Sequence, residues 1–331
     1  MKETYYIFNS GELVRKGNTV YFKNEEQETK RALPIENIES LYIFGEITLN
    51  KRLLAFFNEK NILLHFFNYY GFYIGSFMPR DYLNSGMLIV KQVEHYLDKS
   101  KRLLLAREFL RGATHNMLSN LKYYQRRGKE LEEEIKTITK HLGEQKTSPE
   151  VAALMGLEGN IRKIYYKAFN KILREGYTFT ERVKRPPDNK INCLISFGNS
   201  LVYRTVLTEI YHTFLNPTIS YLHEPAEGRF SLSLDLAEIF KPVIVDQVIF
   251  SLVNKQKIND EDFKKELKFC YLNEKGRTKF VKEFDERLHA TVKNEKLKRN
   301  ISYKRLIRLE CYKLIKHVIG DKRFIAYKKS W

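Results

Sequence analysis

The hydrophobic period of this chain changes once, near residue 85, and that change constrains the fold more than any single motif. Residues 1–80 consist of short segments in which apolar and polar residues alternate, divided by turn signals such as Gly17-Asn18. Alternation with a period of two, bounded by turn residues, indicates β-strands. From residue 86 the apolar residues recur at intervals of three and four, which indicates long amphipathic helices. The sequence therefore predicts an α+β chain with two domains.

The predicted architecture is a small N-terminal β-sandwich domain, residues 1–85, followed by a larger all-α domain, residues 86–331. The chain has 331 residues, which is enough for two domains that each bury a core. We expect roughly six to nine strands in the first domain, because turn signals divide it into short segments. Almost everything after the boundary is predicted to be helical.

Composition excludes several classes of protein. Hydrophobic residues make up 43% of the chain, which excludes a disordered protein. No segment approaches the roughly 20 uninterrupted apolar residues of a membrane span, and the N-terminus lacks the layout of a signal peptide. The cysteines, Cys193, Cys270 and Cys311, show no C-x-x-C spacing, so neither a disulfide framework nor a zinc cluster is indicated. We expect a cytoplasmic protein with no membrane partner.

The net charge of +18 lies entirely in the second predicted domain. Residues 1–85 contain ten basic and ten acidic side chains, whereas residues 86–331 contain 48 basic and 30 acidic ones. This asymmetry indicates that the helical domain meets a polyanion such as nucleic acid. A basic surface that only keeps the protein soluble is the alternative interpretation.

Glu158 is the first candidate for a functional site. It lies in a helical segment, residues 154–166, among apolar residues, and Gly159 follows it directly. A glycine inside a helix costs about 1 kcal/mol relative to alanine, so close approach of another backbone or of a ligand would explain it. The alternative is a simple ion pair with Arg162, one helical turn later, on a solvated face.

A second group of ionisable residues follows near residue 230. His223 lies in a turn-rich loop, and Asp235 and Glu238 lie three residues apart on an otherwise apolar helical segment. That spacing places both carboxylates on one helix face, where they cost free energy unless a cation lies beside them. The cation can be a metal ion or a basic side chain such as Lys241. The segment is not H-E-x-x-H, because Glu227 occupies the second histidine position, so no zinc-protease site is indicated.

Three stretches of the chain resemble one known family, the CRISPR-associated adaptation integrases and endonucleases. Residues 154–159 resemble its L-M-G-x-E-G segment, and residues 185–199 resemble its R-P-P-x-D-x-x-N-A-L-L-S-F-G-Y segment. Residues 216–246 resemble its segments D-P-x-x-G-F-L-H, R-x-S-L-A-L-D-L-M-E and F-R-P. The resemblance covers nearly the whole chain and implies a β-domain followed by a helical catalytic domain.

The resemblance also implies a reaction and a set of site residues. Members of the family join the 3′-hydroxyl ends of a short spacer DNA to a repeat array by transesterification, and water in place of the hydroxyl makes the same site a nuclease. The family's metal ligands fall on Glu158, His223 and Glu238, and Asp235 falls on a supporting acidic position. Such a set of ligands suits Mn²⁺ or Mg²⁺.

The chain departs from the family pattern at positions beside the ligands. Asn216 replaces an aspartate before proline, and Ser220-Tyr221 replaces a glycine-phenylalanine pair. Asn199 stands where a tyrosine is common. We expect these changes to affect the shape of the loop and the fit of the DNA end rather than the chemistry.

Basic residues in two segments, together with one arginine after His223, are candidates for phosphate contacts. The connector, residues 182–190, and the tail, residues 293–329, are both rich in lysine and arginine, and the charged residues of the tail helix are expected to lie largely away from its buried stripe. Contacts to phosphate give affinity without sequence preference. The candidates are Arg182, Lys184, Arg185, Lys190, Arg229, Lys304, Arg305 and Arg308.

The resemblance further implies partners, and two alternative functions stay open. The partners are double-stranded and branched DNA, a second copy of the chain, and the family's small ferredoxin-like protein. We expect the homodimer to form through residues 1–85, because that part carries no net charge. The alternatives are a non-catalytic basic nucleic-acid-binding protein, in which the carboxylates form internal ion pairs, and a stand-alone metal-dependent repair nuclease.

Overall fold

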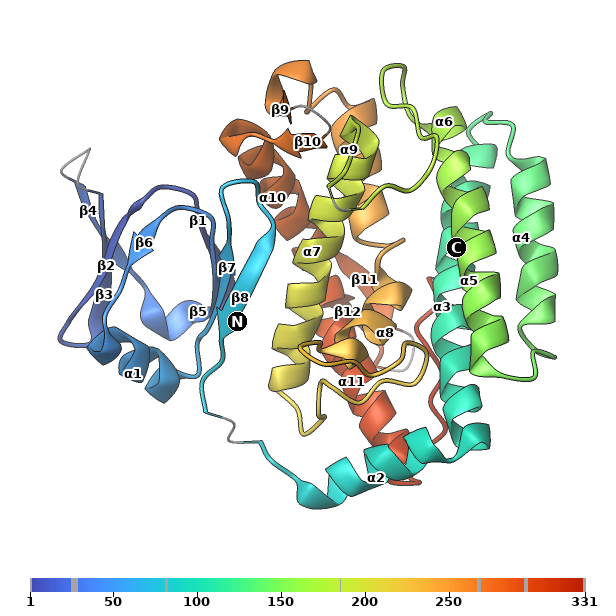
Figure 1. Cartoon of the computed structure of the whole chain (residues 1–331), viewed down its shortest axis with the longest axis horizontal. Coiled ribbons are helices and arrows are strands. Elements are labelled where there is room, and N and C mark those ends of the chain that lie inside the picture. The colour runs from blue at the N-terminus through green and yellow to red at the C-terminus, as the bar shows by residue number, and fades with distance from the viewer. Residues whose placement is uncertain are drawn as a thin grey trace.

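The computed structural model describes residues 2–24, 29–80, 83–184, 186–266, 269–294 and 297–329. A strand-rich region ends at β8 (Tyr73–Phe77), and a larger helical region begins at α2 (Gly86–Leu97). Figure 1 shows the strand-rich N-terminal region on one side of the molecule and the larger helical region on the other. The predicted fold class is confirmed, and the predicted boundary at residue 85 falls between β8 and α2.

Two four-stranded sheets form the N-terminal region. The first sheet has the order β1 (Glu3–Ile7), β5 (Ile38–Ile43), β7 (Leu63–Phe67) and β8. In it β1, β5 and β7 are parallel and β8 is antiparallel to β7. The second sheet has the order β4 (Thr29–Leu33), β3 (Thr19–Asn24), β2 (Gly11–Lys16) and β6 (Ile47–Thr48). In it β2 pairs antiparallel with β3 and parallel with β6.

The inner faces of the two sheets share one hydrophobic core with helix α1 (Lys51–Lys60). The side chain of Asn50 accepts a hydrogen bond from the Leu53 amide and so caps the start of this helix. Leu13 and Val20 of the second sheet pack in the same cluster as Leu41 of the first. The sandwich is therefore built by alternation, since every second residue of a strand faces the core.

The remaining helices form the C-terminal region. Their bounds are α3 (Lys99–Gln125), α4 (Glu132–Glu144), α5 (Val151–Lys167), α6 (Phe169–Ile172), α7 (Lys190–Tyr211), α8 (Ser231–Phe240), α9 (Val245–Asn254), α10 (Glu274–His289) and α11 (Tyr303–Val318). Short 3₁₀ turns occur at Ile35–Asn37 and Asp260–Asp262. Within the described part of the chain, no helix is long and apolar enough to cross a membrane.

The helical region also contains two short β-hairpins that the expected all-α domain did not include. One joins β9 (Phe263–Glu266) to β10 (Phe269–Leu272), and the other joins β11 (Thr291–Asn294) to β12 (Arg299–Ser302). These strands have only four residues each, so they are too short to show a reliable alternating pattern in the sequence.

Helix α7 lies at the centre of the molecule, between the first sheet and the other helices (Figure 1). A side chain at Gly198 would place its Cβ 2.5 Å from Val245 Cγ1 and 2.8 Å from Phe280 Cζ, so glycine permits the close approach of α9 and α10. On the side of the sheet, the hydroxyl groups of Tyr42 and Thr205 are 3.3 Å apart. Helix α7 therefore joins the two regions into one packed body.

A buried group of charged side chains also ties the sheet to the helices. We call it the interface cluster, and its members are Glu39, Glu209, His212, Lys304 and Arg308. Glu39 on β5 contacts Lys304 Nζ at 2.5 Å and Arg308 Nη2 at 2.6 Å, both from α11. Arg308 Nε also contacts Glu209 Oε2 at 2.6 Å, and His212 Nε2 lies 3.2 Å from Glu39 Oε1. These contacts fix the position of α11 against both β5 and α7.

Candidate active site

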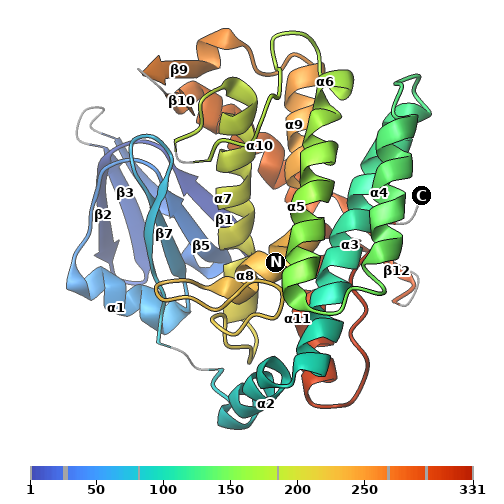
Figure 2. The ribbon, with the colours of Figure 1, turned by 45° about the vertical axis from the view of Figure 1, so that its right-hand side comes forward.

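Helix α8 places two carboxylates in the interior of the helical region. It packs against α3 and α7, and Figure 2 shows it crossing the molecule between α7 and α5. Asp235 is completely buried and Glu238 is 2% exposed. Their spacing of three residues keeps them on one face, as the sequence predicts. Buried carboxylates require compensating donors or cations, and the two residues find them in different ways.

Asp235 binds the loop that carries His223. Its Oδ2 accepts hydrogen bonds from the amides of Tyr221 at 2.7 Å and Leu222 at 2.9 Å, and its Oδ1 accepts from the amide of His223 at 2.9 Å. The same Oδ1 lies 2.8 Å from His223 Nδ1. Because a carboxylate can only accept, Nδ1 is the donor, and in the neutral ring Nε2 keeps its lone pair. Asp235 is therefore a positioning residue for His223.

Glu158 and Glu238 are brought together by Arg162. Arg162 lies one turn after Glu158 on α5, and its guanidinium contacts the carboxylates of both glutamates. The other oxygen of Glu238, Oε1, accepts from Lys241 Nζ at 2.5 Å. Burial would raise the pKa of Glu158, but the nearby charges of Arg162, Lys241 and His223 hold the pKa below its usual value. Glu158 is therefore held as an anion.

These five residues form what we call the site cluster: Glu158, Glu238, His223, Arg162 and Lys241. The ion pairs that the sequence offered as the alternative to a metal, Glu158 with Arg162 and Glu238 with Lys241, are both present. The expected solvated face at Glu158 is wrong, because its side chain is only 14% exposed. The tertiary fold turns this face of α5 inward, where Arg162 contacts Glu238 of α8.

A hollow of about 460 Å³ opens beside His223. It is lined by residues of α5 and of the loop before α8: Val151, Ala152, Met155, Leu222, His223, Glu224, Ala226 and Arg229. Among the described residues outside its own stretch of helix, none has an atom within 4 Å of the position that a Cβ at Gly159 would take, so the close approach of another backbone does not occur there. The space beside Gly159 is open, which agrees with the other explanation for this glycine, the approach of a ligand.

The residue types of the site cluster fit a divalent metal ion. Among the described residues, no group of three His, Cys, Asp or Glu side chains is arranged so that it could hold a metal ion. Basic side chains contact the carboxylates instead. Glu238 Oε2 is buried and contacts the Arg162 guanidinium, and His223 Nε2 is the ring nitrogen that Asp235 leaves unengaged. Two carboxylates and one imidazole are a donor set that Mn²⁺ or Mg²⁺ accepts.

Sequence reasoning missed two residues that belong to this site. Arg162 was considered only as the partner of Glu158, and Tyr203 of α7 was not considered at all. Lys241 Nζ lies 4.7 Å from the centre of the Tyr203 ring. Burial would raise the pKa of Tyr203, but Lys241 and Arg162 together lower the pKa below its usual value. No local spacing links Tyr203 to Glu238, so only the packing of α7 on α8 could reveal it.

The candidates for DNA contact fall into different environments. Lys304 is buried in the interface cluster, and Arg308 is engaged there with two glutamates, so the expectation that these two point away from the core is wrong. The reason is that Glu39 and Glu209 reach α11 from other parts of the fold. Arg305 is partly exposed on the same helix.

Two of the four candidates in the connector already have protein partners. Arg182 donates to Asn192 Oδ1 at 3.0 Å and to Ser196 Oγ at 2.9 Å, and Lys190 contacts Asp260 Oδ1 at 2.6 Å. Lys184 is exposed, and so is Arg229 in the loop after His223. Arg185 lies outside the described residues.

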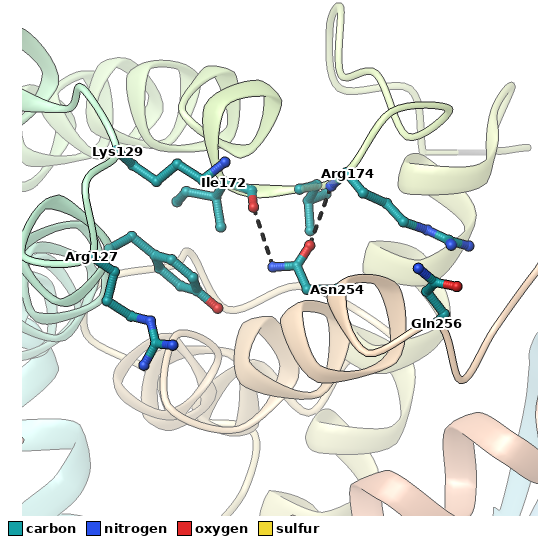
Figure 3. Close-up of a pocket in the computed structure, with 8 residues that line it drawn as sticks. Arg127, Lys129, Ile172, Arg174, Asn254 and Gln256 are labelled. Atoms are coloured by element: carbon teal, nitrogen blue, oxygen red, sulfur yellow. Dashed lines mark hydrogen bonds between the residues drawn. The ribbon is translucent and has the colours of Figure 1, made fainter.

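A second, smaller hollow of about 270 Å³ lies where α3, α6 and α9 end. Figure 3 shows Asn254 at its centre, with Arg127 and Arg174 on opposite sides. Asn254 donates to the Ile172 carbonyl and accepts from the Arg174 amide, each at 3.2 Å. None of the described residues that line the hollow is acidic and three are basic, so it is a basic surface separate from the site cluster.

The chain is similar to known proteins over nearly its whole length. Residues 5–286 match the model of the family described as CRISPR associated protein Cas1. A protein named CRISPR-associated endonuclease Cas1 3, from Thermodesulfovibrio yellowstonii, is 51% identical over 327 residues, which is 99% of each chain. The structure of a Cas1 protein from Thermotoga maritima matches with a TM-score of 0.89 and 42% identity, over 98% of this chain and 100% of that one.

A casposase bound to integration product has the same fold, with a TM-score of 0.88 at 21% identity over 99% of this chain and 94% of that one. The resemblance seen in the motifs is thus confirmed by the family model and by close relatives over nearly the full length. The chain belongs to the Cas1 family of CRISPR-associated proteins.

Proposed function

We propose that the protein is a metal-dependent DNA endonuclease and integrase of CRISPR adaptation, with its active site at the site cluster. One observation carries the proposal: Glu158 of α5 and Glu238 of α8 meet beside His223, whose ring is fixed by Asp235, next to an open hollow. The relative that is 51% identical is named an endonuclease. Its name supports nuclease activity, and the casposase of the same fold, which is bound to integration product, supports the proposed integrase activity.

Glu158, Glu238 and His223 Nε2 would hold the ion in this proposal. A divalent ion bound there supplies positive charge that polarises a phosphodiester and stabilises the charge that develops during its displacement. Asp235 keeps the proton on Nδ1, so that Nε2 keeps its lone pair for the ion. Hydrogen bonds from three backbone amides hold Asp235 itself in place.

In the proposed strand transfer, the 3′ oxygen of the spacer DNA attacks a phosphorus atom of the target strand. A new oxygen–phosphorus bond forms, the bond from phosphorus to the target's own 3′ oxygen breaks, and the proton of the attacking hydroxyl leaves to solvent while the departing oxygen gains one. No oxidant or energy source is required, because one phosphodiester replaces another. When water attacks instead, the product is a nick.

Duplex DNA would reach the site across the exposed basic side chains nearest to it. Lys184 and Arg229 are exposed, and Arg229 lines the hollow beside His223. Contacts of lysine and arginine to phosphate give affinity that falls with salt. Lys304 and Arg308 are not part of this surface, because the interface cluster engages them.

The proposed partners are a second copy of the chain and a small ferredoxin-like protein of the same system. The homodimer is expected to form through the N-terminal sandwich, which carries no net charge and so avoids the repulsion between two strongly basic regions. Sedimentation of the full-length protein with and without charge-reversal substitutions on the exposed face of the sandwich tests this contact.

A strand-transfer assay tests the proposed function. A short duplex with free 3′-hydroxyl ends is incubated with supercoiled plasmid and Mn²⁺, and joined products are separated from nicked plasmid. The control duplex ends in 3′-dideoxynucleotides, which removes the attacking hydroxyl and nothing else. We expect joining only with the free ends, nicking with both duplexes, and neither after addition of EDTA.

The two alternative functions give different results in the same assay. A stand-alone repair nuclease would nick the plasmid equally with either duplex and never join them. A non-catalytic binding protein would retain the plasmid on a filter and leave it intact, with or without Mn²⁺. The internal ion pairs of Glu158 and Glu238 are the observation that favours this last alternative, so the absence of any joined or nicked product would decide for it.

A further inference from the structure

Arg162 occupies the place between the two glutamates that a metal ion would need. Its guanidinium contacts Glu158 on its own helix and Glu238 on α8, and Nη1 also donates to Tyr166 Oη at 3.2 Å. The Arg162 side chain is 16% exposed, so little water reaches it. Arg162 therefore links the carboxylate on α5 directly to the carboxylate on α8.

The two glutamates already have two contacting cations without a metal ion. Glu158 and Glu238 contribute two negative charges, and Arg162 and Lys241 contribute two positive ones. A divalent ion that entered this arrangement would meet two cations within a poorly solvated space, where repulsion between like charges is strong. A guanidinium does not lose its proton in proteins, so Arg162 can yield the carboxylates only by moving.

A displaced guanidinium needs a new anion. Leaving it unpaired in this buried space would cost several kcal/mol, as for any buried charge that loses its partner. A phosphate group of DNA is the anion that the proposed substrate brings to the same place, and arginine binds phosphate through two parallel hydrogen bonds. The open space beside Gly159 and the hollow beside His223 leave room for this exchange.

We propose that Arg162 is a resident counter-cation that couples metal binding to DNA binding. In the free protein its guanidinium holds Glu158 and Glu238 together. When a DNA phosphate binds the guanidinium, the two carboxylates are released and bind the divalent ion. This inference rests on the proposed function, because it takes the site cluster as the metal site. It predicts that metal and DNA each strengthen the binding of the other by the same factor, as linkage requires.

Mn²⁺ titration followed by electron paramagnetic resonance tests the coupling without any measure of catalysis. The full-length protein is titrated alone and with a short duplex that ends in 3′-dideoxynucleotides, so that no joining occurs. We expect the duplex to tighten Mn²⁺ binding to the wild type about 10-fold or more, within the usual range of coupling between sites. Equal affinity in both conditions overturns the inference, and this measurement needs no substitution.

Substitution of Arg162 sharpens the test. Arg162→Gln removes the competing cation, so we expect Mn²⁺ to bind about 10-fold more tightly than to the wild type in the absence of DNA, and the duplex to add little further affinity. Lys163→Gln is the matched control, since it removes the same charge from the adjacent, exposed position on α5. Unchanged Mn²⁺ affinity in Arg162→Gln, or an equal gain in Lys163→Gln, contradicts the role of Arg162.

Failure of the inference differs from failure of the proposed function. Suppose that the wild type binds Mn²⁺, that Glu158→Gln abolishes this binding, and that the duplex leaves the Mn²⁺ affinity unchanged. The metal site then stands, and Arg162 does not couple it to DNA. If the wild type binds no Mn²⁺ with or without DNA, both proposals fall. If Arg162→Gln does not fold, the comparison of wild type with and without duplex still decides.

Discussion

The interface cluster and the site cluster contain the same residue types, namely two glutamates, one histidine, one lysine and one arginine, yet only the site cluster is proposed as the active site. Two structural differences separate them. His212 of the interface cluster directs Nε2 at Glu39, whereas His223 of the site cluster is held through Nδ1 by a further carboxylate, Asp235. A hollow of about 460 Å³ opens beside His223, whereas the interface cluster lies between packed β5, α7 and α11.

The electrostatics of the interface cluster fit a structural role. Burial would raise the pKa of Glu39, but Lys304, His212 and Arg308 hold that pKa below its usual value. Burial, together with the charge of Glu39, raises the pKa of Glu209 to about 7. Burial lowers the pKa of His212 to about 4. The comparison teaches that residue types alone do not make an active site; the orientation of the imidazole and access from solvent do.

The largest expected difference is in catalysis. Glu158→Gln and Glu238→Gln each remove one proposed ligand, so we expect strand transfer to fall by about 10³-fold or more, a loss comparable with that of a group that stabilises the transition state. Glu209→Gln in the interface cluster keeps the shape and should retain activity within a few-fold. Strand-transfer rates, with melting curves for each variant, make the comparison. Comparable losses in both clusters would remove the distinction between them.

The second expected difference is in stability. Glu39→Ala leaves Lys304 and Arg308 short of their shared anion in a buried interface, so we expect a loss of about 3–5 kcal/mol in the free energy of unfolding. Glu158→Ala should cost less, because Arg162 keeps its contact with Glu238. Urea denaturation of the metal-free proteins measures both values. A larger loss for Glu158→Ala would show that the site cluster is the stronger structural element.

Asp235→Asn tests the feature that the interface cluster lacks. The amide cannot accept hydrogen bonds from the three backbone amides and from His223 at once, so the loop and the ring lose their fixed orientation. We expect Mn²⁺ affinity to fall about 10–100-fold, as for other residues that orient metal ligands. Titration with Mn²⁺ measures it, and Asp260→Asn, at an exposed surface ion pair, is the control. Unchanged affinity would show that Asp235 only supports the loop.

The pH dependence of stability should separate the two titrating members of the interface cluster. The folded-state pKa of Glu209, about 7, lies above its ordinary value, so its contribution to stability is lost as pH rises from about 4.5 to 7. The folded-state pKa of His212, about 4, lies below its ordinary value, so its contribution is lost as pH falls from about 6.5 to 4. In the wild type these two trends oppose each other.

Single substitutions should expose each trend. We expect His212→Gln to lose about 1–2 kcal/mol of stability as pH rises from 4.5 to 7, and Glu209→Gln to lose a similar amount as pH falls from 6.5 to 4. Melting temperatures across this range measure the slopes. Slopes of the same sign in both variants would contradict the assignment of the two pKa values.

The smallest expected effects concern DNA affinity. Lys184→Ala and Arg229→Ala should each weaken duplex binding a few-fold and reduce the salt dependence by about one counterion. Lys304→Met, in the interface cluster, should leave the salt dependence unchanged because that side chain is engaged by Glu39. Filter binding at several salt concentrations, below the melting temperature of each variant, distinguishes them. A reduced slope for Lys304→Met would place DNA near α11.

Local sequence patterns predicted much of this molecule. The change of period near residue 85 separates strands from helices, and the family motifs pointed to Glu158, His223 and Glu238. The spacing of Asp235 and Glu238 correctly predicted one shared helix face, since the helical period relates residues three apart. Similarly, Arg162 and Lys241 were foreseeable as partners of nearby glutamates on their own helix. The four-residue strands of the helical region were missed because they are too short to show a period.

By itself, the sequence determined where the N-terminal strands give way to long helices, where the positive charge gathers, and which ionisable residues share a helix face. Only the tertiary structure decided that Arg162 reaches Glu238 on another helix, that Asp235 turns His223, and that Lys304 faces inward to Glu39. The physical reason is the range of each interaction. Periodicity and capping act within a few residues, whereas a buried charge takes its partner from whichever element the packing of the whole chain brings within reach.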